Sequence, residues 1–216
     1  MNKLTDENLK TFRVERKEIP HYRFGLLYRL LQQPVKRVLD IGCWNRELLE
    51  MFPSETEKHG LDLVARDFGP SIHFRVADIS EGLPYPDNFF TAVIAGEIIE
   101  HLMEPARFLK DIFRILDANG QLILTTPNLS YWRNAIQLIK SDNFFWVDYD
   151  FNQNGHVRYF SPKTIRKMLR KNGFKVKKLF SIDDVRGTIL LNLIGNLFKS
   201  FSSRHNMNLV VYCIKQ

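Results

Sequence analysis

The hydrophobic positions of this chain follow two different periods along its length. Short continuous apolar runs bounded by turn residues are typical of strands buried on both faces of a parallel sheet. Between these runs lie segments with apolar residues at helical spacing. The alternation predicts an α/β fold, a doubly wound, mostly parallel sheet of about seven strands with helices on both faces. The runs predicted as strands are 35–42, 58–64, 71–78, 89–97, 121–128, 174–182 and 208–216.

Helix-capping and helix-breaking residues mark the ends of the predicted helices. The segment 103–116 has Pro105 near its first turn, where proline is tolerated, and Gly120 is placed to end this helix in the left-handed conformation. Ser161 followed by Pro162 predicts a capped helix start. Further helices are expected at 21–33, 46–52 and 129–139.

A length of 216 residues favours one compact domain over the whole chain, 1–216. Within it, 1–33 is expected to form an N-terminal helical arm. The segment 140–160 is irregular and rich in aromatic residues, so it is interpreted either as an acceptor pocket or lid or as packing beneath a long loop. The segment 184–203 is apolar on more than one face, which predicts a helical insertion over the sheet or, as the minority interpretation, contact with a membrane surface.

The composition disfavours disulfide-rich, secreted and membrane-spanning proteins. The two cysteines, Cys43 and Cys213, have no CxxC or Cys/His ligand spacing, so neither a disulfide framework nor a metal site is predicted. No apolar stretch reaches the length of a membrane-spanning helix, and the first twenty residues lack an apolar core. We therefore expect a soluble, cytoplasmic protein, as a monomer or homodimer.

The net charge of +7 is concentrated at the C-terminal end. From Ser161 onward the chain carries twelve Lys and Arg against two Asp. Such a region can attract nucleic acid, an anionic membrane or a phosphorylated substrate, and it can equally be a solvated surface. No recognised RNA- or DNA-binding motif accompanies it, which disfavours nucleic acid as a partner.

Acidic residues end four successive predicted strands. In a doubly wound sheet, ligands bind at the carboxyl ends of the strands, where the strand order reverses. Gly42 follows the first strand and permits a tight turn close to a ligand. The repetition indicates a nucleoside-like ligand that carries hydroxyls and amines. The four acidic residues are Asp40, Asp62, Asp78 and Glu97.

The sequences VLDIGC and GLD, and the stretch from ADIS to TTPN, resemble the motif series of class I S-adenosylmethionine-dependent methyltransferases. The match runs in order from Val38 to Asn128, and GHVRYFSP resembles a subgroup that modifies sugars and other small molecules. The resemblance implies a Rossmann-like fold, S-adenosylmethionine as cofactor, and transfer of its methyl group to an oxygen, or less favourably a nitrogen, of a small acceptor. That acceptor would be a sugar or its lipid- or nucleotide-linked form.

The resemblance also implies roles for individual residues. The residues at the end of the first strand would line the methionine portion of the cofactor. The residues after the second strand would hold its ribose, and those after the third strand would contact its adenine. Glu97 would open the pocket toward the acceptor. The implied cofactor-binding residues are Asp40, Gly42, Cys43, Trp44, Asp62, Leu63, Asp78, Ile79 and Glu97.

Two features depart from the family pattern. Trp44 and Arg46 stand where the family has glycine, and a left-handed backbone there would be strained by a Cβ atom. The linker 63–71 leaves little room for a crossover helix. The first departure keeps open a second hypothesis, a non-catalytic scaffolding protein with the methyltransferase fold.

Methyl transfer is an in-line displacement in which the protein aligns the acceptor and removes its proton. His101 and His156 are the candidate bases, because imidazole titrates near neutral pH. A structural role is an equal alternative for each histidine. A third hypothesis, RNA methylation, rests on the basic C-terminal region. A nicotinamide dehydrogenase is the weakest hypothesis, because the sequence lacks the G-x-G-x-x-G turn of such enzymes.

Overall fold

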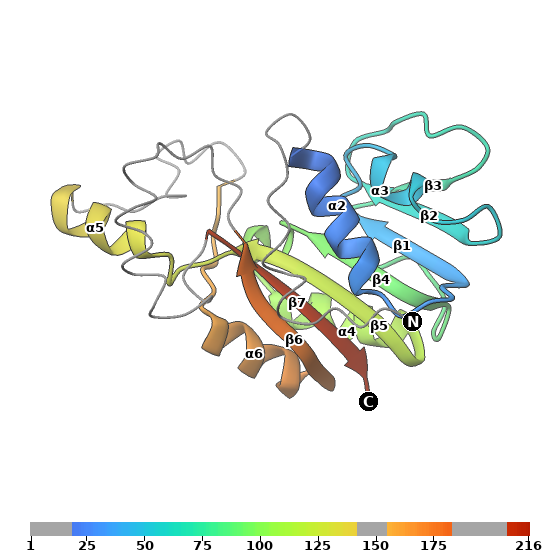
Figure 1. The fold of residues 1–216 in the computed structure, drawn as a ribbon. Helices are drawn as coiled ribbons and strands as arrows, with labels where there is room; N and C mark the ends of the chain where they lie inside the picture. Colours follow the sequence, from blue (N-terminus) through green and yellow to red (C-terminus); the bar gives the residue numbers. More distant parts are fainter. Residues whose placement is uncertain (1–18, 142–154, 183–206) are drawn as a thin grey trace.

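A seven-stranded sheet forms the centre of the computed structural model, which describes residues 19–141, 155–182 and 207–216. Its strand order is β3-β2-β1-β4-β5-β7-β6 (Figure 1). The strands are β1 Arg37–Ile41, β2 Glu57–Asp62, β3 His73–Val76, β4 Phe90–Gly96, β5 Leu116–Pro127, β6 Phe174–Ile182 and β7 Asn208–Lys215. The predicted α/β sheet of seven strands is therefore confirmed.

The first five strands run parallel, and β7 is antiparallel to both of its neighbours, β5 and β6. The order reverses between β1 and β4, because β1 leads outward to β2 and β3 while β4 leads to β5. In open α/β sheets the carboxyl ends of strands at such a reversal form the ligand site. The topology thus directs attention to the residues that follow β1 and β4.

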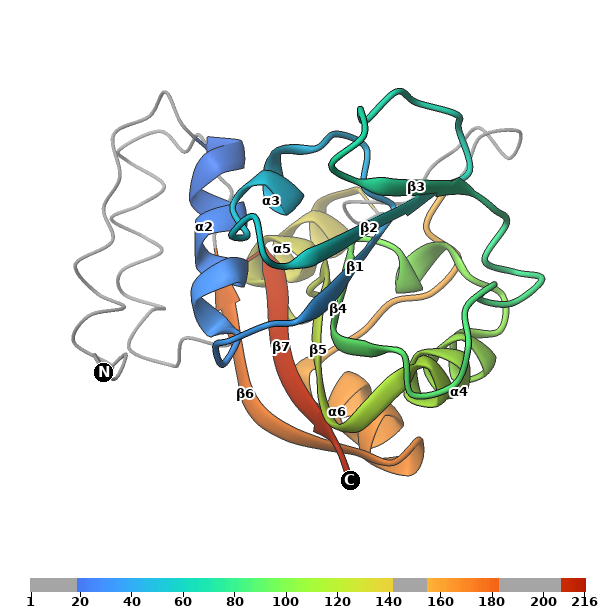
Figure 2. The same cartoon turned by 90° about the vertical axis from the view of Figure 1, so that its right-hand side faces the viewer.

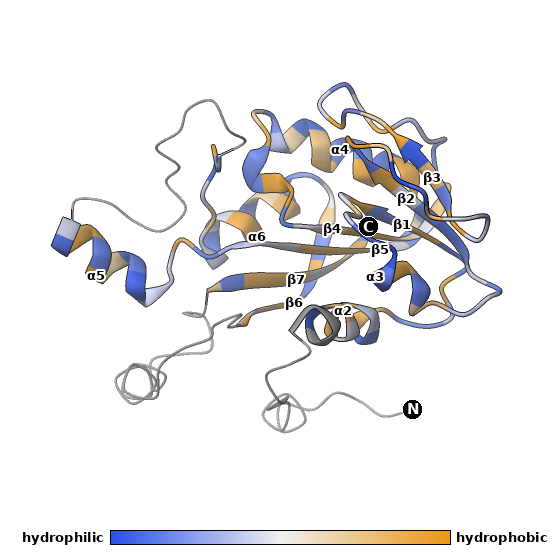
Figure 3. Ribbon diagram, turned by 90° about the horizontal axis from the view of Figure 1, so that it is seen from above, coloured by the Kyte–Doolittle hydropathy of each residue, from blue (hydrophilic) through white to orange (hydrophobic). Residues whose placement is uncertain are grey.

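Helices cover both faces of the sheet, as the hydrophobic pattern predicted (Figures 2 and 3). On one face α4 and α6 pack over a core that includes Leu39, Val93 and Leu122. On the other face α2 and α3 pack over a core that includes Val38 and Ile94. The helical elements are α2 Ile19–Leu30, α3 Glu47–Glu50, the 3-10 turn η1 Ile99–His101, α4 Pro105–Ile115, α5 Trp132–Ser141 and α6 Pro162–Lys171.

The residues predicted to start α4 and α6 are confirmed at the N-termini of these helices. Pro105 is the first helical residue of α4, where its missing N–H costs no hydrogen bond. The Ser161 hydroxyl accepts a hydrogen bond from the Thr164 N–H, and the Thr164 hydroxyl oxygen accepts one from the Ser161 N–H. This reciprocal capping box fixes the start of α6.

The prediction that Gly120 ends α4 is wrong. The helix ends at Ile115, and the next residue, Leu116, already pairs with Phe90 of β4 at the start of β5. Asn119 takes the left-handed conformation at φ +64°, and Gly120 lies within β5. The helix α4 therefore ends where β5 begins to pair with β4, five residues before Gly120.

The linker between β2 and β3 contains no helix, as its length predicted. Phe68 from this linker stacks on Phe74 of β3, with ring centroids 4.7 Å apart. The linker is thus held to the edge of the sheet by an aromatic contact.

Several predictions lie outside the described residues. These are the first eighteen residues of the N-terminal arm, most of the aromatic segment at 142–154, and the apolar insertion at 184–203. Within the part of the chain that is described, no helix has the length and apolar character needed to cross a membrane.

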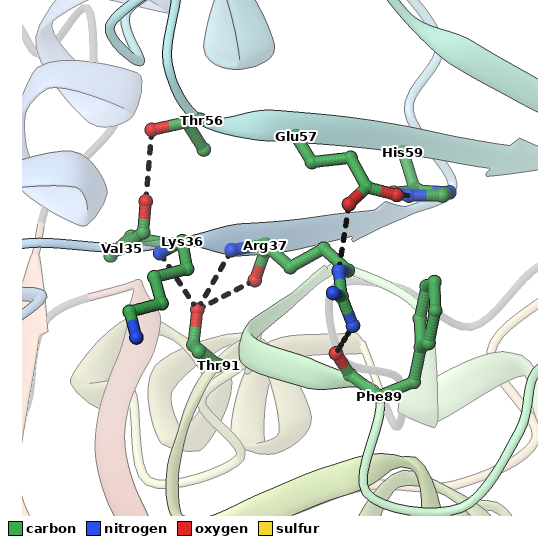
Figure 4. A network of polar contacts seen from close by, with 8 residues as sticks. All are labelled: Val35, Lys36, Arg37, Thr56, Glu57, His59, Phe89 and Thr91. Atoms are coloured by element: carbon green, nitrogen blue, oxygen red, sulfur yellow. Dashed lines mark hydrogen bonds and ion pairs between the residues drawn. The ribbon is translucent and has the colours of Figure 1, made fainter.

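A polar network ties the amino ends of β1, β2 and β4 together (Figure 4). The Arg37 guanidinium donates to Glu57 Oε2 at 2.8 Å and to the Phe89 carbonyl at 2.7 Å, and it lies 4.1 Å from the centre of the Phe89 ring. The Thr91 hydroxyl accepts the Arg37 N–H at 3.0 Å and donates to the Arg37 carbonyl at 2.8 Å. The network lies at the opposite end of these strands from the reversal site.

Replacing Arg37 by alanine is expected to lower stability without affecting ligand binding. The variant loses two charge-assisted hydrogen bonds and a cation–π contact, about 1–2 kcal/mol together. Thermal unfolding should then shift down by about 2–8 °C. The neighbouring exposed Lys36→Ala variant is the control and should unfold like the wild type. Equal melting temperatures for the two variants would contradict this role of the network.

Candidate active site

The turn after β1 depends on the backbone freedom of Gly42. This glycine has φ +71°, and a Cβ atom on it would lie 2.4 Å from Ile98 Cδ1. The Gly42 N–H donates to the Leu61 carbonyl at 2.7 Å, which fixes the turn against the end of β2. The backbone is therefore held in a tight left-handed turn that leaves no room for a side chain.

Trp44 and Arg46 fit this turn without backbone strain. Neither has a positive φ, and Arg46 stands at φ −87° as the residue before α3. Trp44 is 69% exposed, and the Arg66 guanidinium lies 4.0 Å from the centre of its ring. Arg46 Nε pairs with Glu50 Oε1 at 2.5 Å. The bulky residues point outward, so the altered glycine pattern leaves the Gly42 turn intact.

Asp40 is buried at the end of β1, with only 7% of its surface exposed. Burial raises the pKa of Asp40 to about 8; the Arg23 guanidinium of α2 opposes this rise and the Asp62 carboxylate adds to it. Asp40 and Asp62 therefore lie close enough to interact, at the ends of neighbouring strands. A positively charged group bound between them would stabilise both carboxylates.

The other residues implied on the cofactor side occupy different environments. Asp62 is half-buried, and its Oδ1 accepts the Val64 N–H at 3.0 Å. Asp78 is exposed, and hydrogen bonds from Ser80 lower its pKa. Leu63 is exposed and Ile79 is half-buried against the core.

Cys43 turns its side chain away from the strand ends. The thiol is buried, and it limits the space at Gly60, where a Cβ atom would lie 2.8 Å from Cys43 Sγ. Burial raises the pKa of Cys43 to about 12. The backbone of Cys43 is therefore the part that remains beside the Gly42 turn.

Glu97, directly after β4, has φ +56°, a left-handed conformation that is uncommon for a residue with a side chain. The Thr125 hydroxyl donates to Glu97 Oε1 at 2.7 Å, and the Glu97 N–H donates to the Thr125 carbonyl at 3.0 Å. Such strain persists where the surrounding structure over-determines it, and it concentrates at functional sites.

The fold brings His101 and His156 together, although 55 positions separate them. Their ring centroids lie 4.8 Å apart. The Glu100 carbonyl accepts the N–H groups of Val157 and Arg158, each at 2.9 Å, and the Arg158 guanidinium donates to the Met103 carbonyl at 2.8 Å. The segment with His156 is thus fastened to η1, beside the end of β4.

Sequence reasoning assigned no role to two charged residues at this site. Arg23 of α2 lies close enough to lower the pKa of both Asp40 and Glu100. Glu100 is 1% exposed; burial raises its pKa to about 8, and the Glu97 carboxylate adds to the rise. The position of Glu100, three residues after Glu97 at the end of a predicted strand, was a usable signal, whereas nothing in the helical pattern distinguished Arg23 from a surface arginine.

Comparison with known proteins agrees with this arrangement. Residues 16–179 match the family model described as "Methyltransferase domain". The human mitochondrial ubiquinone biosynthesis O-methyltransferase is 24% identical over 91% of this chain and 56% of its own length. The chain spans about half the length of the curated relatives it matches.

Solved structures share the fold. A SAM-dependent methyltransferase from Archaeoglobus fulgidus has a TM-score of 0.65 at 20% identity, over 98% of this chain and all of that one. The Burkholderia thailandensis 1,6-didemethyltoxoflavin-N1-methyltransferase, solved with bound 1,6-didemethyltoxoflavin and S-adenosylhomocysteine, has a TM-score of 0.64 at 14% identity, over 97% of this chain and 83% of that one. The family match covers most of the sequence, so the chain belongs to the class I S-adenosylmethionine-dependent methyltransferases.

Proposed function

We propose that this chain binds S-adenosylmethionine and transfers its methyl group to an oxygen of a small acceptor. The observation that carries the proposal is the pair Asp40 and Asp62 at adjacent strand ends beside the Gly42 turn. A left-handed glycine without space for a Cβ atom allows close approach of a ligand to the backbone. The residues present therefore fit the cofactor of the family.

The charges at the end of β1 match the amino-acid portion of this cofactor. Asp40 would hold the ammonium group, and Arg23 would pair with the carboxylate. Asp62 would accept hydrogen bonds from the ribose hydroxyls, and the exposed Asp78 with Ile79 would border the adenine. When bound, the cofactor supplies a methyl group on a positively charged sulfur.

On the acceptor side, Glu97, His101 and His156 would position and deprotonate the acceptor. One of the two histidines would accept the hydroxyl proton at an imidazole nitrogen, and the acceptor oxygen would then take the methyl group that the bound cofactor would supply. Holding the two reactants in line can remove a large part of the barrier to such a displacement. A small oxygen acceptor is supported by the human relative, which is an O-methyltransferase of ubiquinone biosynthesis.

The cytoplasmic location, the monomeric or dimeric state and the sugar- or lipid-linked nature of the acceptor stay predictions. The scaffolding alternative loses its main argument, because Trp44 and Arg46 leave the Gly42 turn unstrained. It becomes the conclusion if the following experiment finds no cofactor binding.

Calorimetric titration with S-adenosylmethionine and S-adenosylhomocysteine tests the proposal. We expect micromolar binding to the wild type and at least about 30-fold weaker binding to Asp62→Ala, because two hydroxyl hydrogen bonds to a carboxylate are lost. Glu55→Ala, which removes an exposed carboxylate before the amino end of β2, is the matched control and should bind like the wild type. Folded wild-type protein that binds neither ligand would overturn the proposal.

A further inference from the structure

Three groups that can ligate metals converge beside the end of β4. Glu100 and His101 belong to η1, and His156 belongs to the segment that leads to α6. One ligand atom from each residue lies within 4.8 Å of the others. We propose that these three side chains form a binding site for a divalent transition-metal ion of the Zn²⁺ type.

The buried carboxylate of Glu100 gives independent support. Its Oε2 accepts a hydrogen bond from the Thr126 hydroxyl at 2.9 Å. Its Oε1 is also buried, but within the described residues it accepts no hydrogen bond. A buried carboxylate oxygen without a partner is costly, and a bound cation would remove that cost.

The site is held together before any ion binds. The Glu100 carbonyl accepts two backbone N–H groups from Val157 and Arg158, so the residue after His156 is fixed to the same turn that carries Glu100 and His101. The Thr126 hydroxyl orients the Glu100 carboxylate from β5. Supporting hydrogen bonds of this kind orient metal ligands and raise affinity.

The ligand set selects the kind of ion. Two imidazoles with one carboxylate suit Zn²⁺ and related transition metals, whereas Mg²⁺ and Ca²⁺ prefer oxygen ligands alone. Bonds from Zn²⁺ to these ligands measure about 2.0–2.2 Å, which requires ligand atoms about 3.3–3.5 Å apart. Because His101 is exposed, rotation of its side chain can close the remaining distance.

The position of the site suggests a role in the proposed methyl transfer. Three protein ligands would leave a fourth position open, where the ion would lower the pKa of a bound acceptor hydroxyl and favour release of its proton to water. This role rests on the proposed function. It would make His101 and His156 ligands that activate an acceptor hydroxyl through the ion, in place of direct bases. The metal site itself stands apart from that role and is tested without cofactor or acceptor.

The experiment measures Zn²⁺ binding by the chelator-stripped chain 1–216, with calorimetry for affinity and elemental analysis for stoichiometry. The variants are His156→Ala and Glu100→Gln, and Gln can still accept the Thr126 hydrogen bond. His73→Ala is the matched control, since this exposed histidine lies on β3 and stacks on His59. Both cysteines are buried and have their pKa raised to about 12, so their thiols are not expected to compete for the ion.

We expect one Zn²⁺ per chain in the wild type and in His73→Ala, and about 100-fold weaker binding in His156→Ala and Glu100→Gln. Mg²⁺ should bind weakly to all four proteins. No stoichiometric Zn²⁺ binding by the wild type, or equal affinity in all four proteins, would overturn the proposal. Titration with S-adenosylhomocysteine reports separately on the cofactor site, so Zn²⁺ binding without cofactor binding would reject the proposed function and keep the metal site.

Discussion

Asp40→Asn is expected to abolish S-adenosylmethionine binding while it stabilises the ligand-free protein at neutral pH. Burial holds the pKa of Asp40 at about 8, against 3.8 in an unfolded chain. Between these values the folded state keeps a proton that the unfolded state releases, so this residue lowers stability as pH rises from about 4 to 8. Asparagine keeps the shape of the protonated side chain and does not titrate.

The stability gain of Asp40→Asn should therefore depend on pH. At pH 7 we expect it to be on the order of 3 kcal/mol, or about 5–10 °C in the melting temperature. The gain should shrink to less than about 1 kcal/mol at pH 4, close to the unfolded-state pKa of 3.8, because the unfolded state then also holds much of the proton. Thermal unfolding of both proteins at pH 4, 5, 6, 7 and 8 measures this difference directly. The contribution of Glu100 to the pH dependence of stability is the same in both proteins and therefore cancels.

The same substitution removes the carboxylate that would face the cofactor ammonium group. Loss of that ion pair is expected to weaken binding at least about 100-fold. Wild-type affinity should increase as pH rises toward 8, because binding requires ionised Asp40. Asp78→Asn is the control for stability: this carboxylate is exposed and hydrogen bonds from Ser80 lower its pKa, so no gain at pH 7 is expected. An equal gain in both variants would contradict the assignment to buried Asp40.

Gly42→Ala is expected to eliminate cofactor binding and to destabilise the fold. The new Cβ atom would meet Ile98 Cδ1 at 2.4 Å, in a backbone conformation at φ +71° that side chains disfavour. Strain and the shift of Ile98 together are expected to cost about 2–4 kcal/mol. Urea unfolding measures the loss of stability, and calorimetry with S-adenosylhomocysteine measures the loss of binding.

Gly25→Ala separates the effect of position from the effect of an added methyl group. Gly25 lies in α2, and the nearest atom to its added Cβ would be Met51 Cε at 4.0 Å. Alanine should therefore be neutral or slightly stabilising there, since glycine weakens helices. If Gly42→Ala binds and unfolds like Gly25→Ala, the turn after β1 does not form the cofactor site.

Much of the fold could be predicted because its signals are local. The strand at 174–182 coincides with β6, and the buried stripe at Phe108, Leu109 and Ile112 coincides with one face of α4. Periodicity reports which side of an element is buried, and capping residues such as Ser161 act within one turn. These features are encoded within a few neighbouring residues, so they can be recognised without knowledge of distant contacts.

The sequence by itself determined the α/β class, the sites of the helices and strands, and the acidic residues at the ends of β1 and β2. Only the tertiary structure decided that α4 ends before Gly120, that Trp44 points outward, and that Glu100 lies beside His101 and His156. The physical reason is that these three features depend on contacts between segments far apart in sequence. Strand pairing at Leu116 and the hydrogen bonds from Val157 and Arg158 to Glu100 form only after the chain has folded.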